Sequence, residues 1–323
     1  MSHEEPASDV LAFLEKQGFS VTPTTLARWH RSGLIPRPRT EYLGQGRGTE
    51  SLYPSGTSRQ VLAICDLKQR FYNLNDVGFC LWLNGYPVGE AFSIRYLKAA
   101  GERLDQIISR LKVGREKLDS DDDGVADEAW SQFEKIGTAK TSIKFVRKLR
   151  KRVGAKNFDG AGLVCIDILL GHFNGFNSED HHSFMRIMMG LRVIKVGILN
   201  GVLAWLKNSI EDPLIQLSAL FAQQSFSLQI SSESLESLNE ARIEFQQLFF
   251  GLTNFAWKIS EVLKIKLPGY YQLYEVMKYA NGFDLAIIFL MWCRIRRSSW
   301  ASGYPEIIQA LQRAGFTSAL EKQ

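Results

Sequence analysis

The chain has 323 residues, 45% of them hydrophobic and 23% charged, with a formal net charge of +5. This apolar share excludes an intrinsically disordered chain, and the length favours two domains. The longest uninterrupted apolar run, Leu285 to Cys293, is less than half of the roughly twenty residues that a membrane span needs. The four cysteines lack the spacing of a zinc site or a disulfide framework, and the acidic N-terminus lacks the pattern of a secretory signal. We therefore expect a globular cytoplasmic protein that does not enter a membrane.

Two short helices are predicted near the N-terminus. Ser8 is a candidate N-cap for the first helix, which Gly18 ends. Thr22 is a candidate N-cap for the second helix, with Pro23 at the first helical position and Gly33 just past the last turn. Two helices joined by a few residues predict a helix-turn-helix.

The second of these helices has two chemically different faces. Leu26 and Trp29 lie three residues apart on one face and are predicted to enter a core. The opposite face carries hydrogen-bond donors and positive charge at Thr24, Thr25, Arg28 and Arg31. Such a face is typical of a recognition helix that meets base edges and phosphates of double-stranded DNA.

The next segment, "RPRTEYLGQGRGTESLYP" at residues 37–54, is rich in glycine and proline and is predicted to form a hairpin or wing. It contains the basic residues Arg37, Arg39 and Arg47. From residue 28 to residue 70, eight basic residues stand against three acidic ones, so the whole net charge of the chain can be assigned to this window. Two further helices are predicted at about 57–72 and 75–83, and Pro87 and Gly89 mark the end of this domain.

The run "VTPTTLARWHRSGLIP", the arginine-bearing glycine-rich segment, "LYP" and "VLAICDLKQRFYNLNDVGFCLWL" together resemble the DNA-binding domain of MerR-family regulators. The resemblance covers residues 8 to 83. It implies a winged helix-turn-helix whose recognition helix contributes Thr24, Thr25, Arg28 and Arg31 and whose wing contributes Arg47 and Tyr53. Ala27 stands where the family usually has an arginine that contacts DNA, and Arg28 follows it directly. A winged helix that contacts another protein is the alternative interpretation.

A seven-residue repeat follows the predicted domain. Leu97, Leu104, Leu111 and Leu118 form a heptad seam over three heptads. In MerR-like proteins a long helix at this position mediates dimerisation, so the resemblance implies a homodimer. An amphipathic helix packed within its own chain needs the same spacing and is the alternative.

The acidic run "DSDDDGVAD", Asp119 to Asp127, matches part of a calcium loop. The bidentate glutamate of an EF-hand is missing, because Trp130 occupies its position. We interpret the run as an acidic, solvated linker, and we expect neither a metal site nor a cofactor.

From Glu128 onward the apolar residues follow a helical period without strand alternation, which predicts an all-α region. The expected helices span about 128–152, 160–173, 181–208, 213–229, 233–265, 270–297 and 304–320. Candidate N-caps are Ser178, Asp212, Ser231 and Ser232. The region is rich in aromatic residues, which form either a core or a pocket for an apolar ligand.

We therefore expect a mainly α-helical protein with three parts: a winged helix-turn-helix domain at 1–88, a linking or dimerisation helix with an acidic linker at 89–127, and an all-helical effector or interaction domain at 128–323. Candidate DNA-binding residues are Thr24, Thr25, Arg28, Arg31, Arg37, Arg39, Arg47 and Tyr53. No nucleophile motif, phosphate loop or paired-carboxylate pattern predicts an enzyme. The sequence favours a dimeric transcriptional regulator that responds to a small-molecule or protein effector, and the alternative is an adaptor that acts through protein contacts.

Overall fold

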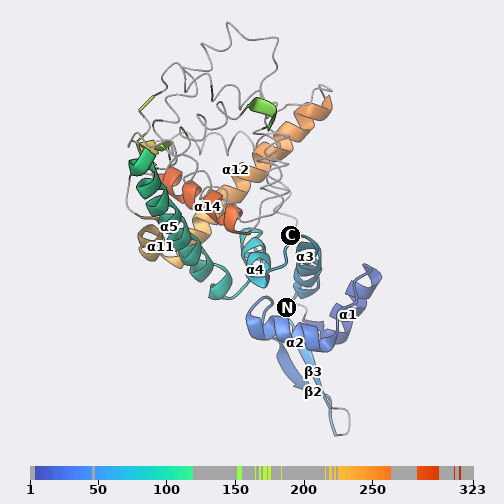
Figure 1. The fold of residues 1–323 in the computed structure, drawn as a ribbon. Helices are drawn as coiled ribbons and strands as arrows, with labels where there is room; N and C mark the ends of the chain where they lie inside the picture. Colours follow the sequence, from blue (N-terminus) through green and yellow to red (C-terminus); the bar gives the residue numbers. More distant parts are fainter. Residues whose placement is uncertain are drawn as a thin grey trace. The chain divides into compact units, whose positions relative to one another are not determined.

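A computed structural model describes residues 4–45, 48–118, 151–154, 225–262 and 282–297, together with a few further residues between 164 and 222 and residues 309 and 313. This part of the chain is mainly helical and contains a small three-stranded sheet (Figure 1). The prediction of a mainly α-helical protein is thereby confirmed.

The chain divides into two compact units. Unit 1 comprises Met1–Gly101, Ile230–Leu252 and Tyr279–Gln323, and unit 2 comprises Glu102–Gln229 and Thr253–Lys278. The expected domain at 1–88 is therefore contained in a larger unit that also takes in segments from the C-terminal region.

Unit 1 begins with a strand and two helices, β1 (Glu5–Pro6), α1 (Ala7–Lys16) and α2 (Pro23–Ser32). The local signals for α2 are confirmed: Thr22 Oγ1 accepts a hydrogen bond from the Thr25 amide at 3.2 Å, and Gly33 ends the helix in the left-handed conformation with a φ of 81°. The prediction that Ser8 caps α1 was wrong. Because β1 pairs with the sheet immediately before the helix, α1 starts at Ala7 and Ser8 lies inside its first turn.

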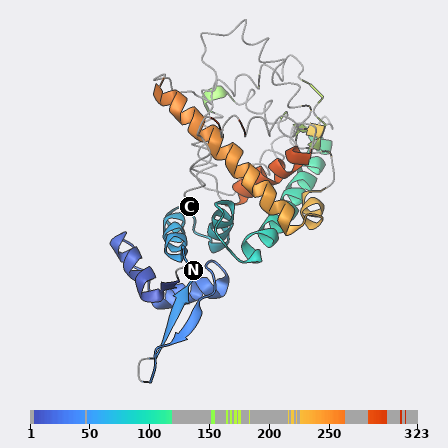
Figure 2. The same ribbon diagram turned by 180° about the vertical axis from the view of Figure 1, so that it is seen from behind.

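The sheet is antiparallel and has the order β1-β3-β2, with β2 at Arg39–Tyr42 and β3 at Thr49–Tyr53. β2 and β3 form a hairpin that extends from the side of α2 in both views (Figures 1 and 2). The Leu43 amide donates to the Gly48 carbonyl at 3.0 Å and closes its connecting loop.

Helices α3 (Thr57–Arg70) and α4 (Leu74–Leu83) follow the hairpin and lie within two residues of their expected bounds. The carboxylate of Glu5 caps α3 by accepting hydrogen bonds from the Gly56 amide at 2.6 Å and the Ser58 amide at 2.8 Å. Asn73 caps α4 through its side chain, which accepts from the Asn75 amide at 3.0 Å. Helix α3 is thus capped by a residue distant in the sequence, and α4 by the residue directly before it.

The 3-10 helix η1 (Glu90–Phe92) packs against α4 through Phe92, which lies beside Gly78. An aromatic cluster joins α4 to the start of α5 (Ile94–Leu118) and to two C-terminal helices, α12 (Leu235–Val262) and α14 (Gly282–Arg297). Phe79 stacks on Tyr96 with ring centroids 4.7 Å apart, and Trp82 meets Phe289 edge-on at 5.3 Å. Phe289 in turn meets Phe245 edge-on at 5.7 Å. α4 is therefore covered by helices from both ends of the chain, which explains why every residue from Val77 to Leu83 is buried.

Polar contacts fix α12 to α4. Arg242 Nη1 donates to the Trp82 carbonyl at 3.0 Å, and Gln246 Nε2 donates to the Leu83 carbonyl. These carbonyls belong to the last turn of α4, where helical carbonyls lack partners within the helix and where positive charge is favoured.

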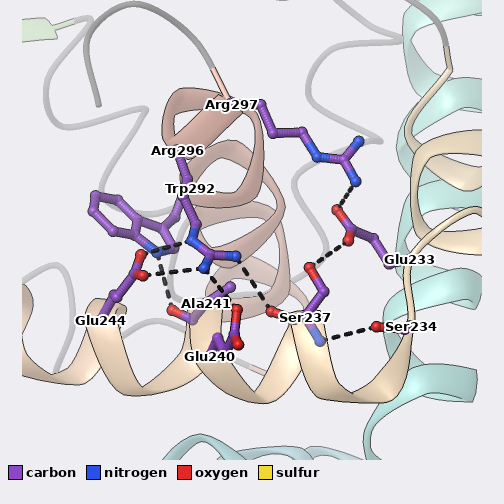
Figure 3. A network of polar contacts seen from close by, with 9 residues as sticks. All are labelled: Glu233, Ser234, Ser237, Glu240, Ala241, Glu244, Trp292, Arg296 and Arg297. Atoms are coloured by element: carbon purple, nitrogen blue, oxygen red, sulfur yellow. Dashed lines mark hydrogen bonds and ion pairs between the residues drawn. The ribbon is translucent and has the colours of Figure 1, made fainter. Parts of the chain in front are cut away.

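A second set of contacts fixes α14 to α12 (Figure 3). Arg296 pairs with Glu244 at 2.7 Å and with Glu240 at 3.1 Å, and Arg297 pairs with Glu233. The Trp292 indole donates to the Ala241 carbonyl at 3.0 Å. Arg296 and Trp292 thus join α14 to α12, and Arg297 joins α14 to the segment just before α12.

In unit 2, the carboxylate of Asp105 on α5 accepts hydrogen bonds from the amides of Phe226 at 2.8 Å and Ser227 at 3.0 Å, which open helix α11 (Phe226–Ser231). The expected helix 213–229 is therefore replaced at its C-terminal end by a short helix that begins at Phe226. Ser231 and Ser232 do not cap the next helix as expected. Ser234 does so instead, accepting from the Ser237 amide at 3.0 Å.

Candidate nucleic-acid interface

Helix α2 presents a buried face and an exposed face. Leu26 and Trp29 are buried, and the ammonium of Lys68 on α3 lies 5.6 Å from the centre of the Trp29 ring. These contacts fix the rotation of α2 about its axis. Thr24, Arg28 and Arg31 are consequently exposed on the opposite face, as the sequence predicts.

The polar residues of this face differ in their local bonding. Thr25 is only half-exposed, and its hydroxyl lies 3.0 Å from that of Thr22 within the helix cap. Arg31 Nε donates to the Ala27 carbonyl at 3.2 Å, while the side chain as a whole stays exposed. The face therefore offers Thr24 and two guanidinium groups to a partner, whereas Thr25 mainly stabilises the start of the helix.

The hairpin also has two faces, which follow from its register. Arg39 pairs with Leu52 across the strands, and Glu41 pairs with Glu50. Successive residues of a strand point to opposite sides, so Arg39, Glu41, Glu50 and Leu52 share one face. The remaining strand positions, Thr40, Tyr42, Thr49, Ser51 and Tyr53, share the other.

Acidic groups dominate the first of these faces. Arg39 makes a two-pronged contact with Glu4, whose closest N–O distance is 2.7 Å, and a second contact with Glu41 at 3.3 Å. The guanidinium of Arg39 lowers the pKa of Glu4 through their hydrogen bond. Glu50 accepts a hydrogen bond from the Ser8 hydroxyl at 3.2 Å. The charge of Arg39 is therefore compensated by carboxylates, although this residue was predicted to contact DNA.

The structure corrects the prediction for Tyr53. The sequence places it among the wing residues that contact DNA, but its side chain is only 3% exposed and lies in the core of unit 1. Burial raises the pKa of its phenol. The cause is the register of β3, because Tyr53, its last residue, points toward the helices. We therefore leave Tyr53 out of the candidate interface.

Of the other residues predicted for a wing, Arg37 is exposed and Arg47 lies outside the described residues. Sequence reasoning missed Tyr42, the exposed tyrosine of the hairpin, at 67% exposure. The sequence contains two tyrosines in this segment, Tyr42 and Tyr53. The pairing of β2 with β3 was needed to tell which of them is exposed.

The structure also corrects the prediction that the heptad leucines form a dimer interface. Leu97, Leu104 and Leu111 are buried within the single chain, with Leu104 only 4% exposed. An interface between two copies would leave these side chains exposed in one copy alone. The seam of α5 therefore serves packing within the chain, which was the alternative; the side chain of Leu118 lies outside the described residues.

The acidic run at 119–127 also lies outside the described residues. Among the helices that the structure describes, none combines the length and the apolar character required to cross a membrane.

Comparison with known proteins adds no identification: no protein family, no curated protein and no solved structure matches the chain.

Proposed function

We propose that this chain is a sequence-specific DNA-binding transcriptional regulator whose N-terminal elements act as a winged helix-turn-helix. The observation that carries the proposal is the exposed face of α2, where Thr24, Arg28 and Arg31 stand opposite the buried anchors Leu26 and Trp29. A helix held by one face and offering hydroxyl and guanidinium groups on the other suits the major groove. The resemblance of residues 8–83 to the MerR-family domain supports the same function.

The two arginines have complementary tasks in this proposal. Arginine reads guanine by two parallel hydrogen bonds to O6 and N7 and otherwise binds backbone phosphates. Arg28 and Arg31 lie three residues apart, so they project from neighbouring turns of the same helix face. Such a pair can divide base reading and phosphate contact between them. Which of the two reads a base follows from whether its loss changes the preferred sequence or only the affinity.

The C-terminal helices supply a physical route for regulation. Arg242 and Gln246 of α12 bind the last carbonyls of α4, which packs against α3 in the same unit. A ligand or protein that shifts α12 would therefore act on the helices that support α2. The proposal includes no dimer seam on α5, because the leucines expected to form it are buried.

The test is DNA selection followed by affinity measurement with the full chain. Duplexes selected from a random library would be measured by fluorescence anisotropy at several salt concentrations. Arg28→Ala and Arg31→Ala should each weaken binding by about 1–3 kcal/mol if a base contact is lost, and a lost phosphate contact should lower the log–log salt slope by about 0.9. Arg110→Ala removes the same charge from an exposed position on α5 and should change neither quantity.

Folding must be controlled in this test. Arg28→Ala and Arg31→Ala alter exposed side chains, so their thermal unfolding should match that of the wild type. Selection of no preferred duplex, or equal affinity for all three arginine variants and the wild type, would contradict the proposal. The alternative function, an adaptor that uses the same face for a protein, would then take its place.

A further inference from the structure

Tyr42 combines unusual exposure with a defined place on the hairpin. Its side chain is 67% exposed at the last residue of β2, where it pairs with Thr49. An exposed aromatic ring on a short hairpin contributes little to a core. Thr40 and Thr49 are exposed on the same face, so this part of the hairpin offers one ring and two hydroxyl groups without any charged strand residue.

The opposite face of the hairpin is unsuited to a polyanion. Glu41 and Glu50 are directly opposite each other, an arrangement that repels unless other groups compensate it. Arg39 contacts Glu41 and Glu4, and Ser8 contacts Glu50. The three carboxylates outnumber the one guanidinium, and their charge would repel DNA phosphates. Only the Tyr42 face can approach DNA without this penalty.

We propose that the hairpin contacts duplex DNA through Tyr42, with Thr40 and Thr49 as neighbouring hydroxyl donors to phosphate, and that Arg39 takes no part. This inference rests on the proposed function and specifies how its second element binds. The phenol hydroxyl donates to a phosphate oxygen, and the ring packs on the sugar or base edge of a groove. These contacts involve no net charge, so they orient the hairpin without adding to counterion release.

The experiment compares four variants of the full chain on the selected duplex. Tyr42→Ala should weaken binding at least ten-fold, since the hydrogen bond to a charged phosphate is alone worth about that much and the ring contact is lost with it. The salt slope should stay that of the wild type, because no charge is removed. Tyr42→Phe should lose only the contribution of the hydroxyl group, so its affinity should lie between those of the wild type and Tyr42→Ala. Arg39→Ala should change affinity less than two-fold and leave the slope unchanged.

Tyr72 provides the matched control. It is the other exposed tyrosine of unit 1 in the described part of the chain, and it follows the C-terminal end of α3. Helix α3 has 14 residues and starts four residues after β3, so the two tyrosines are separated by about 20 Å of helix. Tyr72→Ala should bind DNA like the wild type. The thermal unfolding of both alanine variants should be unchanged, because neither side chain is buried.

The outcomes separate this inference from the proposed function. If Arg28→Ala weakens binding while Tyr42→Ala behaves like Tyr72→Ala, the inference is wrong and the function stands. If Arg39→Ala lowers both affinity and salt slope, the acidic face approaches DNA and the inference is likewise overturned. If the wild type selects no duplex, the proposed function fails, and the Tyr42 contact fails with it.

Discussion

Cys80 and Cys293 lie in the core of unit 1, where burial raises the pKa of each thiol to about 12. A neutral thiol is a poor nucleophile and a poor metal ligand. Both residues therefore act as small apolar side chains, and the chemistry of the cysteine is set by its surroundings.

The raised pKa makes stability depend on pH. In the unfolded chain Cys80 loses its proton above its ordinary pKa of 9.0, whereas in the folded chain it keeps the proton up to about 12. Between these values the unfolded state binds fewer protons, so the free energy of unfolding should fall as the pH rises, by about 1.4 kcal/mol per pH unit for each such thiol. Below pH 9 the thiol is protonated in both states and contributes no pH dependence.

Urea denaturation at a series of pH values measures this effect. Cys80→Ala should be less stable at neutral pH because it leaves a cavity. Its loss of stability between pH 9 and 12 should nevertheless be shallower than that of the wild type. Parallel curves for the two proteins would show that Cys80 titrates alike in the folded and unfolded chains.

Features that depend on neighbouring residues could be predicted from the sequence, whereas features that depend on distant residues could not. The ends of α2 are set by Thr22, Pro23 and Gly33, which act through contacts within a few residues. Their pattern alone therefore predicted where the helix begins and ends. Tyr53 and Ser8 depend on the sheet: the pairing of β1 and β3 buries the first and moves the start of α1 ahead of the second. No periodicity in the sequence specifies that a two-residue strand at the N-terminus joins this sheet.

At the scale of elements, α4 owes its close packing to a glycine. The ring of Phe92 in η1 lies over Gly78, and a Cβ atom placed on Gly78 would stand only 2.3 Å from Phe92 Cδ1. Gly78 is therefore required by a neighbour rather than by its own backbone conformation. The sequence predicted the helix here but gave no reason for a glycine within it.

Replacement of Gly78 sets two effects against each other. Alanine is the better helix former by about 1 kcal/mol, which alone would stabilise α4. The clash with Phe92 should outweigh this gain, because overpacking a dense core typically costs about 1–3 kcal/mol. Chemical denaturation should therefore show Gly78→Ala to be less stable than the wild type.

A second change identifies the cause. Phe92→Ala removes Cγ and Cδ1, the two Phe92 atoms closest to the new Cβ atom, so Gly78→Ala should cost less in this background than in the wild type. A stabilised Gly78→Ala protein, or equal costs in both backgrounds, would refute the packing explanation.

At the scale of the whole molecule, the N-terminal elements do not form a separate domain in the described part of the chain. Trp82 on α4 packs against Phe289 on α14, and its carbonyl accepts from Arg242 on α12. The sequence placed a boundary at residue 88 because Pro87 and Gly89 are typical of a linker. Such residues mark a turn in the chain, whereas a domain boundary depends on which surfaces bury each other, and helices α12 and α14 are more than a hundred residues away along the chain.

The heptad repeat of α5 illustrates the same limit and gives the last prediction. A seven-residue period requires only that one stripe of the helix be covered, and it does not indicate whether a second chain or the same chain covers it.

Leu104 is 4% exposed and Val113, on the same helix, is 55% exposed. A lysine at Leu104 would place an unpaired charge in the core, so Leu104→Lys should lower the free energy of unfolding by several kcal/mol, as buried unpaired charges do. Val113→Lys introduces the same charge at a solvated position and should stay within about 0.5 kcal/mol of the wild type. Urea denaturation at two protein concentrations, together with sedimentation, checks this: the loss at Leu104 should not depend on concentration. A Leu104→Lys protein that keeps its fold and merely changes from dimer to monomer would restore the interface between two copies.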